Sequence, residues 1–450
     1  MKPQPEPLGT PRSDLAAAAV GIERVPEQFR VLGFFDHFVL WADLGVGLLV
    51  LAAGSYLVPG LSLPQALLVI VLGTLLGNLM LGLAGVIGSE HAIPSMVSLR
   101  PSFGRRGSYL PSLINVVQLV GWGAYEIVIM ATASSRLSGP ILGIAGYPIW
   151  AIFWGAIVLL LALGGPLVVV RQWLEKAGIW VVLLTVSWMA LYALTHGDLG
   201  ASWNKPGDGS SNLAQGLDLV VAMPISWLPL VADFNRFART SRSSFAGTFA
   251  GFGLANAMCF TLGVLLVLVL PAGDLTASIM SITFGAAGLV LLLGDETDNA
   301  FADVYSTAIS IKNVAPGLPT RGLLAAVGGT CVAIALAVDM NSFQNFLLLV
   351  GSLFTPLFGV LFADYFILRR RRYTEEELYP ADARGGPPWG GVNPVALVAW
   401  AAGAAVYWAE TTYVHTLGGT LPSLAASMGV YLAVSVSIGA LRRPRSAVAH

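Results

Sequence analysis

The chain has 450 residues, of which 56% are hydrophobic and only 11% are charged, and its formal net charge is −1. A soluble globular domain is about a quarter charged, so this composition excludes an ordinary soluble protein. The repeated apolar runs of about 20 residues lack the short alternation that a membrane β-barrel requires. The small net charge also indicates no nucleic-acid partner. The sequence therefore predicts an all-α protein that crosses the lipid bilayer many times.

Apolar windows separated by turn residues predict about twelve transmembrane helices. The span at 280–311 is long and could begin as a separate short helix. The predicted spans lie near residues 34–58, 64–88, 111–134, 147–169, 177–195, 213–236, 245–270, 280–311, 321–338, 342–367, 394–410 and 423–441.

The positions of Lys and Arg orient these spans. If the N-terminal tail lies in the cytoplasm, all 24 Lys and Arg fall in cytoplasmic segments except Arg136 and Lys205. Cytoplasmic loops of membrane proteins collect such residues. The polar, Pro-rich start lacks the plan of a cleaved signal peptide. We therefore expect a multi-pass protein of the cell (inner, cytoplasmic) membrane with both termini in the cytoplasm.

The first span places a carboxylate at mid-membrane, in the stretch "LWADLGVG". A charged group at this depth is costly and usually faces a cavity or a partner. Asp43 is such a group, and it lies near Trp41, Gly45 and Gly47. The glycines allow the helix to unwind and expose carbonyl oxygens that can bind a cation, although they could instead serve only close helix packing.

The third span carries three polar or aromatic residues on one helical face. Gln118, Trp122 and Glu126 follow steps of four residues, so they lie above one another. An indole offers a stacking surface, and an amide and a carboxylate offer directional hydrogen bonds. Together they suit a flat, nitrogen-rich ring. The alternative is that Trp122 only packs and Glu126 pairs with another helix.

The sixth span is interrupted by two prolines. Pro224 and Pro229 each remove a backbone donor and disfavour a regular helix. Ser226 and Trp227 lie between them at mid-depth, which makes them candidates for the same site as Trp122.

The eighth span contains an unusual set of acids in "GDETDNAFADVYSTAIS". Close carboxylates are tolerable inside a membrane only if some are protonated or a cation lies among them. We therefore predict a cation-binding wall here, against the alternative of an acidic vestibule or a loop between two helices. One helical face carries Asp295, Asn299, Asp303, Ser306 and Ser310, with Asp298 beside it and Glu296 and Thr297 further round.

The interrupted spans one and six are five spans apart, as are the polar spans three and eight. Such correspondence is typical of transporters built from inverted repeats, whose binding site lies at the midplane. The predicted divisions are an N-terminal tail (1–33), a first repeat (34–195), a second repeat (213–367), a cytoplasmic loop (368–393), two peripheral spans (394–441) and a C-terminal tail (442–450).

Several motifs resemble the nucleobase:cation symporter-1 family, the purine–cytosine permease group. They are "GIERVPEQFR", "LWADLGVG", "LVGW", "VADFNRFAR", "DNAFADVYSTAIS" and "GSLFTPLFGVLFADYFILRR", in this order over roughly residues 22–370. The resemblance implies a leucine-transporter-like fold of two inverted five-helix repeats plus two extra helices. It also implies uptake of a nucleobase-like ring coupled to sodium or protons.

The resemblance also implies roles for particular residues. Trp122 would stack on the ring, Gln118 would bond to it, and Trp227 would close its other face. The family's cation site, formed by span-one carbonyls and span-eight hydroxyls, fits this chain in two registers. One places Asp295 and Glu296 at the ion and Thr297 at the ring, and the other places Ser306 and Thr307 at the ion, with Asp303 three residues earlier.

The sequence thus predicts a secondary active transporter, not an enzyme, that imports a nucleobase or related nitrogen heterocycle. Alternatives within the fold are carriers of a thiamine-precursor pyrimidine, of hydantoin or allantoin, or of an amino acid. An amino-acid carrier would need donors for the substrate carboxylate, and the spans contain no Lys or Arg at mid-depth to supply them. A channel or intramembrane enzyme would need a pore motif or catalytic constellation that we do not find. No cofactor is expected beyond sodium or a proton, and no obligatory protein partner.

Overall fold

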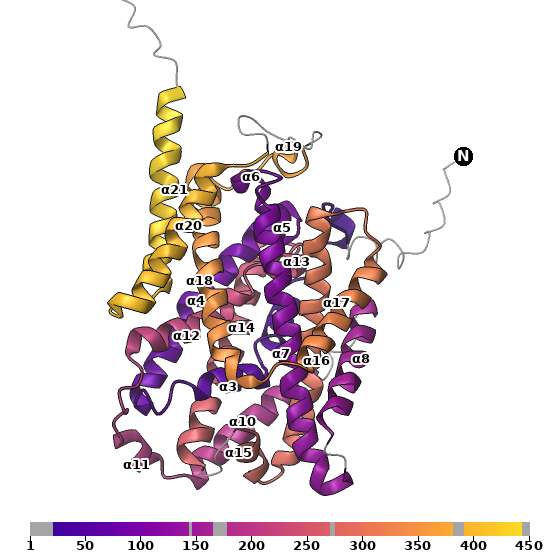
Figure 1. Cartoon of the computed structure of the whole chain (residues 1–450), viewed down its shortest axis with the longest axis vertical. Coiled ribbons are helices and arrows are strands. Elements are labelled where there is room, and N and C mark those ends of the chain that lie inside the picture. Colours follow the sequence, from indigo (N-terminus) through magenta and orange to yellow (C-terminus); the bar gives the residue numbers. More distant parts are fainter. Residues whose placement is uncertain (1–20, 144–145, 165–177, 271–274, 381–390, 443–450) are drawn as a thin grey trace, which may run out of the picture.

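A computed structural model describes residues 21–143, 146–164, 178–270, 275–380 and 391–442. The described chain is built from helices that run mainly along one common direction (Figure 1). The long helices are apolar on most faces, which is the pattern of helices surrounded by lipid or by other helices rather than by water. This arrangement confirms the predicted all-α membrane architecture.

Within the described residues, six helices are long and apolar enough to cross a membrane, and one bent helix pair makes a seventh. Shorter apolar helices supply further segments of the bundle. The long helices are α4 (Leu63–His91), α7 (Tyr109–Leu142), α10 (Ile179–His196), α14 (Ser241–Val269), α18 (Phe343–Phe362) with the π-helix η4 (Ala363–Leu368), and α21 (Thr420–Arg442). The shorter ones are α8 (Tyr147–Gly164), α12 (Leu213–Ser226), α17 (Thr320–Ala335) and α20 (Pro394–Ala409).

The first span is broken, as its glycines predict. It consists of α2 (Phe34–Asp43) and α3 (Leu48–Ser55), whose axes differ by 62°. Gly45 and Gly47 lie in the break, and a Cβ atom on Gly45 would come within 2.9 Å of the Ala255 Cβ atom. The break therefore needs glycine because neighbouring helices approach its backbone closely.

Two other predicted spans are also interrupted. Helix α12 ends at Ser226, and the chain becomes helical again in α13 (Val231–Asn235), so the span is interrupted as predicted, with Pro224 in the last turn of α12 and Pro229 within the break. The predicted eighth span begins as a separate short helix, α15 (Leu275–Ser281), which precedes α16 (Gly285–Val314). The acids of this span lie within continuous helix and not in a loop.

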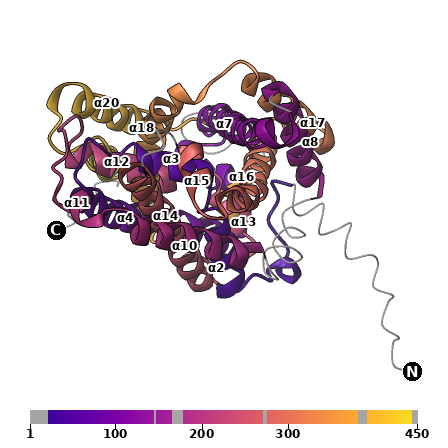
Figure 2. The same cartoon turned by 90° about the horizontal axis from the view of Figure 1, so that it is seen from below.

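The helices pack as two groups, and the second half of the broken first span, α3, lies near the centre of the bundle where the groups meet (Figure 2). In one group, α7 packs against α8, α16 and α17. In the other, α14 packs against α2, α3 and α4, and α12 packs against α4. The second half of the broken span, α3, contacts both α14 and α7, so the break lies at the boundary between the two groups.

Close packing in the second group depends on glycine. A Cβ atom on Gly263 of α14 would overlap the backbone carbonyl oxygen of Leu51 in α3, and one on Gly54 would overlap that of Phe260. Small residues let membrane helices approach until their backbones touch, which compensates for the weak hydrophobic driving force between helices in lipid. The glycines thus fix the position of α3 against α14.

The helices α20 and α21 form the periphery on one side of the bundle, where both pack against α18 (Figure 1). A buried carboxylate joins this layer to the rest, because Asp218 of α12 accepts hydrogen bonds from the backbone N–H groups of Gly419 (2.6 Å) and Thr420 (3.0 Å) at the start of α21. Such a carboxylate stabilises a helix N-terminus, whose first N–H groups lack partners within the helix.

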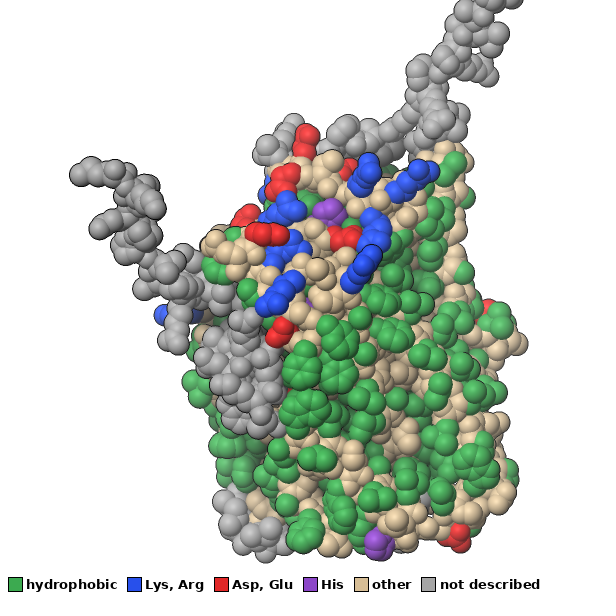
Figure 3. Space-filling view, turned by 180° about the vertical axis from the view of Figure 1, so that it is seen from behind, with side chains coloured by type: hydrophobic (Ala, Val, Ile, Leu, Met, Phe, Trp, Pro, Cys, Tyr) green, Lys and Arg blue, Asp and Glu red, His purple; other side chains and the backbone are tan. Residues whose placement is uncertain are grey.

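Lys and Arg side chains gather at one end of the molecule, above a wide hydrophobic band (Figure 3). Ion pairs link several segments there: Arg371 with Glu90, and Arg369 with both Asp364 and Glu377. The hydrogen bond with Glu90 raises the pKa of Arg371 above its ordinary value, so Arg371 stays charged. These contacts tie the end of α4 to the segment that follows η4.

Buried arginines also join segments of the chain at the Lys/Arg-rich end. Arg100 Nε donates to Asn313 Oδ1 (2.9 Å), and its guanidinium also donates to the carbonyl oxygen of Leu378 (2.8 Å). Arg236 donates to the carbonyl oxygen of Gly21 (2.7 Å), next to Ile22, whose carbonyl accepts from the Tyr379 hydroxyl. The first described residues thus pack at the Lys/Arg-rich end.

Candidate functional site

A small, nearly closed pocket lies at the break of the first span. Its free volume is about 10 Å³, room for about one water molecule, so a ring can enter only if lining side chains move. Residues from the broken first span, α7, the α12–α13 break and α16 surround it. They are Leu44, Gly47, Leu49, Val50, Trp122, Glu126, Met223, Ser226, Trp227, Leu230, Glu296, Asn299 and Asp303.

Helix α7 contributes Trp122 and Glu126 to the pocket, as their spacing predicts. The Trp122 ring is held edge-on by Phe343 and Phe346, with centroid distances of 5.6 and 5.3 Å, so its orientation is fixed from behind. Gln118 lies one turn away and does not line the pocket. Its amide donates to Asn115 Oδ1 (2.9 Å) and to the Ser226 carbonyl oxygen (3.1 Å).

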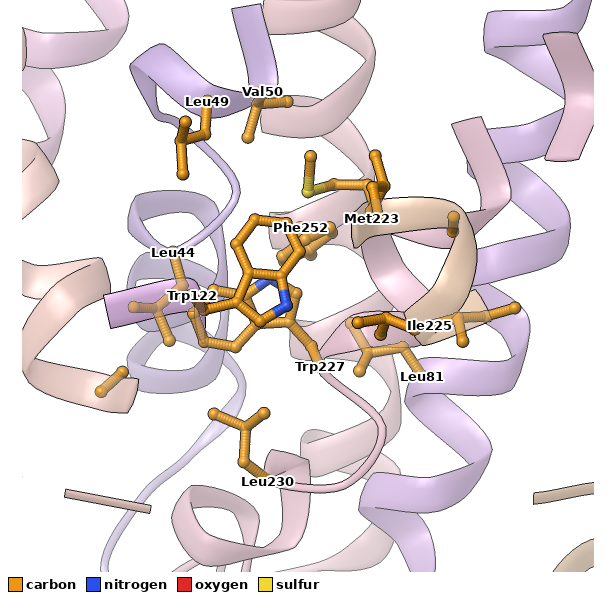
Figure 4. Packing of buried hydrophobic residues seen from close by; sticks show 14 of the residues in the cluster. Leu44, Leu49, Val50, Leu81, Trp122, Met223, Ile225, Trp227, Leu230 and Phe252 are labelled. Carbon is orange, nitrogen blue, oxygen red and sulfur yellow. The ribbon is translucent and has the colours of Figure 1, made fainter. Parts of the chain in front are cut away.

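The end of α12 places a second indole at the pocket. Trp227 packs edge-on against Trp41, with a centroid distance of 5.9 Å and an interplanar angle of 88°. Figure 4 shows Trp122 and Trp227 between Leu49 at one side and Leu230 at the other. The pocket therefore has aromatic and aliphatic walls, which suits a flat ring.

Helix α16 reaches the broken span through two polar side chains. Asn299 Nδ2 donates to the Val46 carbonyl oxygen (2.9 Å), a group freed by the break. The Glu296 carboxylate accepts from the backbone N–H of Leu48 (2.6 Å) and of Leu49 (3.3 Å), the first residues of α3. Both contacts require Gly47, because a Cβ atom there would come within 3.2 Å of Glu296 Oε2 and of Asn299 Nδ2.

Carboxyl groups meet across the boundary between α7 and α16. The side chains of Glu126 and Glu296 lie close to each other, and Asp303 adds a third acidic side chain nearby. Neighbouring carboxyl groups in a buried site avoid mutual repulsion only where one carries a proton or a cation lies among them.

A second acidic group lies on the other side of the break. Asp43 is only 2% exposed, both of its oxygens lack a hydrogen-bond partner, and it lies close to Asp295 and Asp298. Among the described residues, no group of three His, Cys, Asp or Glu side chains has the geometry of a metal site. The Thr297 hydroxyl donates back to the Gly294 carbonyl oxygen (2.6 Å), and Thr297 does not line the pocket.

The two sequence registers for the ion correspond to two different places. Asp295 and Glu296 lie at the level of the break, whereas Ser306 lies about 15 Å further along α16 by helical rise. The Ser306 hydroxyl is near the buried Asp233 of α13, and the Thr307 hydroxyl donates to the Asp303 carbonyl oxygen (2.7 Å). The Trp41 indole N–H donates a hydrogen bond to Asn235 Oδ1 (2.8 Å).

Several buried atoms of the pocket residues have no hydrogen-bond partner: Trp122 Nε1, Glu126 Oε2 and Asn299 Oδ1. Buried polar groups in proteins are nearly always satisfied, so such a cluster indicates a place where a ligand supplies the missing partners. The set contains one donor and two acceptors. A ligand that satisfies it must offer at least two donors and one acceptor.

Sequence reasoning missed the apolar lining, including Met223 and Leu230, and the phenylalanines behind Trp122. Apolar residues carry little signal in a chain that is apolar throughout. Sequence reasoning left open that Glu126 pairs with another helix, but it could not name Glu296, which is far away in the sequence and comes near only because α7 packs against α16.

A membrane-embedded helix bundle with a small pocket of aromatic and carboxyl side chains beside an interrupted helix is typical of a transporter. The chain belongs to the family of permeases for cytosine/purines, uracil, thiamine and allantoin, whose family model matches residues 24–432.

Curated relatives agree with this assignment. The chain is 25% identical over 393 residues to the allantoin permease of Bacillus subtilis (strain 168), which covers 78% of this chain and 79% of the relative. It is 27% identical over 336 residues to the cytosine permease of Escherichia coli (strain K12), covering 71% and 74%.

Solved structures share the fold. Mhp1, a nucleobase-cation-symport-1 family transporter in a closed conformation with bromovinylhydantoin bound, superposes with a TM-score of 0.80 at 18% identity, covering 94% of this chain and 96% of Mhp1. A Na⁺-coupled sialic acid symporter gives a TM-score of 0.62 at 12% identity, covering 95% of each chain. The fold is therefore the predicted leucine-transporter-like one.

Proposed function

We propose that this protein is a secondary active symporter that imports a small nitrogen heterocycle, a nucleobase or a close relative such as hydantoin or allantoin, together with a cation. The observation that carries this proposal is the pocket at the helix break, where two indoles flank the unpartnered atoms Trp122 Nε1, Glu126 Oε2 and Asn299 Oδ1.

A nucleobase edge matches these atoms. Its ring N–H or amino groups donate to Glu126 and Asn299, and a ring nitrogen or carbonyl oxygen accepts from the Trp122 N–H. The ring face lies against the Trp122 and Trp227 side chains, which offer large flat surfaces. Gln118 would not touch the ring. Its amide donates to the carbonyl oxygen of Ser226, the last residue of α12, and so would help to position the end of that helix beside the ring.

We propose that the coupling ion binds at Asp43 beside the helix break, where Asp295 and Asp298 add negative charge without forming a cage of three carboxylate ligands. A sodium ion there would supply partners for the unpaired oxygens of Asp43, with backbone carbonyls of the break as further ligands. Protonation of the same carboxylates would satisfy them as well. Both options support transport in which cation and ring bind at neighbouring sites and each raises the affinity for the other.

Transport would proceed by alternating access. The helix group of α7, α8, α16 and α17 and the group of α2, α3, α4, α12 and α14 would rock about the pocket between them. The ion pairs and buried arginines at the Lys/Arg-rich end would close the path on that side until the ring and the ion are bound. We infer that this end faces the cytoplasm of the cell, as the positive-inside rule indicates.

A ligand screen on the purified protein tests the proposal. Thermal stability is measured with cytosine, uracil, adenine, hydantoin, allantoin and hydroxymethylpyrimidine, each at low and high sodium and at two pH values. A bound ring stabilises the folded state in proportion to its affinity, so at least one ring should raise the melting temperature in a cation-dependent manner. If no heterocycle stabilises the protein under any condition, the proposal is wrong.

A further inference from the structure

The start of α3 is a place where a transporter can bind an anionic group of its substrate. The first N–H groups of a helix have no partner within the helix, and the helix dipole makes this end positive. In transporters with discontinuous helices, such half-helix N-termini point at anionic substrate groups. In this chain the start of α3 borders the pocket, since Gly47 and Leu49 line it.

Here a carboxylate of the protein itself occupies that place. Glu296 is fully buried, and its two oxygens accept from the N–H groups of Leu48 (2.6 Å) and Leu49 (3.3 Å). Gly47 makes room for it, because any side chain at that position would crowd the carboxylate. The position that would attract a substrate anion is therefore filled by an internal anion.

The charges around the pocket reinforce this effect. Its described lining contains three carboxyl groups, those of Glu126, Glu296 and Asp303, and no Lys, Arg or His. The unpartnered pocket atoms are mostly acceptors, and a carboxylate substrate could not donate to them. An anionic group in the pocket would meet like charge without a compensating cation.

We propose that Glu296 is a specificity-determining residue that excludes anionic substrates and restricts the site to neutral or cationic heterocycles with a donor-rich edge. This inference rests on the proposed function and adds the substrate's charge class to it. Selectivity of this kind arises from a repulsive, space-filling element as much as from attraction to the correct substrate.

The test compares a ring with its carboxylated derivative. The pairs are cytosine with 5-carboxycytosine, uracil with orotate, and hydantoin with hydantoin-5-acetic acid, and the pair is chosen by whichever neutral ring the wild-type protein binds best. We expect the wild type to bind the carboxylated ring at least 100-fold more weakly than the neutral parent.

The measured quantity is the ratio of the dissociation constant of the carboxylated ring to that of its neutral parent. In Glu296→Ala the N–H groups of Leu48 and Leu49 become free to bind a substrate carboxylate, so this ratio should fall at least tenfold relative to the wild type. In Glu296→Gln the charge is lost while the shape is kept, and the ratio should fall at least threefold. If Glu296→Ala does not fold, the Gln variant alone decides the test. Asp218→Ala is a matched control, because Asp218 is also a buried carboxylate that caps a helix, away from the pocket.

An unchanged ratio in a Glu296 variant that still binds the neutral ring overturns the role of Glu296 and leaves the proposed function intact. A ratio that falls equally in Asp218→Ala overturns it too, because the effect would then come from general loosening. If the wild type binds no neutral ring, both the proposed function and this inference fail.

Discussion

At the scale of single residues, the account depends on which side chains face the pocket with unmet hydrogen-bonding capacity. The sequence identified Trp122 and Glu126 from their spacing, and the structure places both in the pocket lining. Gln118 has the same spacing but donates to Asn115 and to the Ser226 carbonyl instead. Helical periodicity predicts a shared face, but it cannot tell how far along that face a cavity extends.

Replacement of Trp122 tests the stacking wall. Trp122→Ala removes the flat indole surface and an N–H donor, and stacking on an aromatic ring contributes about 1–3 kcal/mol. We expect ring affinity to fall about 10- to 100-fold, while the cation-dependent stabilisation of the ligand-free protein remains. Isothermal titration with the best ring measures the loss, and ring affinity equal to that of the wild type would contradict the stacking role.

Neutralisation of the acids beside the break tests the ion site. Asp295→Asn and Asp298→Asn each remove one charge close to Asp43, so they weaken a bound sodium ion or remove a protonation site. The sodium or pH dependence of uptake should shift in at least one variant. Initial uptake rates are measured over a range of sodium concentrations and pH. If the sodium and pH dependence of uptake is identical in the wild type and both variants, the coupling ion does not bind at this acidic group.

At the scale of helices, the interruptions were predictable because they arise from backbone chemistry. Gly45 and Gly47 permit the break of the first span, and Pro224 and Pro229 lie just before and within the break of the sixth. What the sequence could not give is which side chain meets each freed backbone group. The contact between Glu296 and α3 depends on how α16 and α3 are placed in space, and that placement depends on packing throughout the bundle.

A glycine contact between helices provides a test at this scale. Gly263→Ala introduces a methyl group that overlaps the Leu51 carbonyl oxygen, so α3 and α14 must separate, at a cost of about 1–3 kcal/mol. We expect a melting temperature several degrees lower, together with weaker ring binding. Gly329→Ala in α17 is the control, because nothing lies within 4 Å of the new methyl group.

The control should be neutral or slightly stabilising, since alanine favours helix over glycine by up to about 1 kcal/mol. A Gly263→Ala variant as stable as Gly329→Ala would show that the close approach of α3 and α14 is not required.

At the scale of the whole molecule, Lys and Arg side chains gather at one end (Figure 3), as their segregation along the sequence predicts. The Lys/Arg-rich end carries the ion pairs of Glu90, Arg369 and Arg371, while the opposite end has little charge on the face seen in Figure 3. The order of apolar spans and the positions of basic residues were enough to predict this polarity. The small size of the pocket was not predictable, because it depends on the relative position of the two helix groups.

Accessibility of introduced cysteines tests the orientation. The native Cys259 and Cys331 are buried, so they should contribute little labelling. Arg372 and Lys205 are both exposed, at opposite predicted sides of the membrane. In intact cells, a membrane-impermeant maleimide should label Lys205→Cys but not Arg372→Cys, and permeabilised cells should label both. The reverse pattern in intact cells would invert the topology.

The central claim is that a cation gradient drives a heterocycle through this protein. The most direct measurement is uptake of the best-binding radiolabelled ring into proteoliposomes with an imposed inward gradient of sodium or of protons. The account predicts that the ring accumulates above its outside concentration with one of these gradients, and that accumulation collapses when the gradient is dissipated. Equilibration of the ring at the same rate with and without either gradient would contradict it.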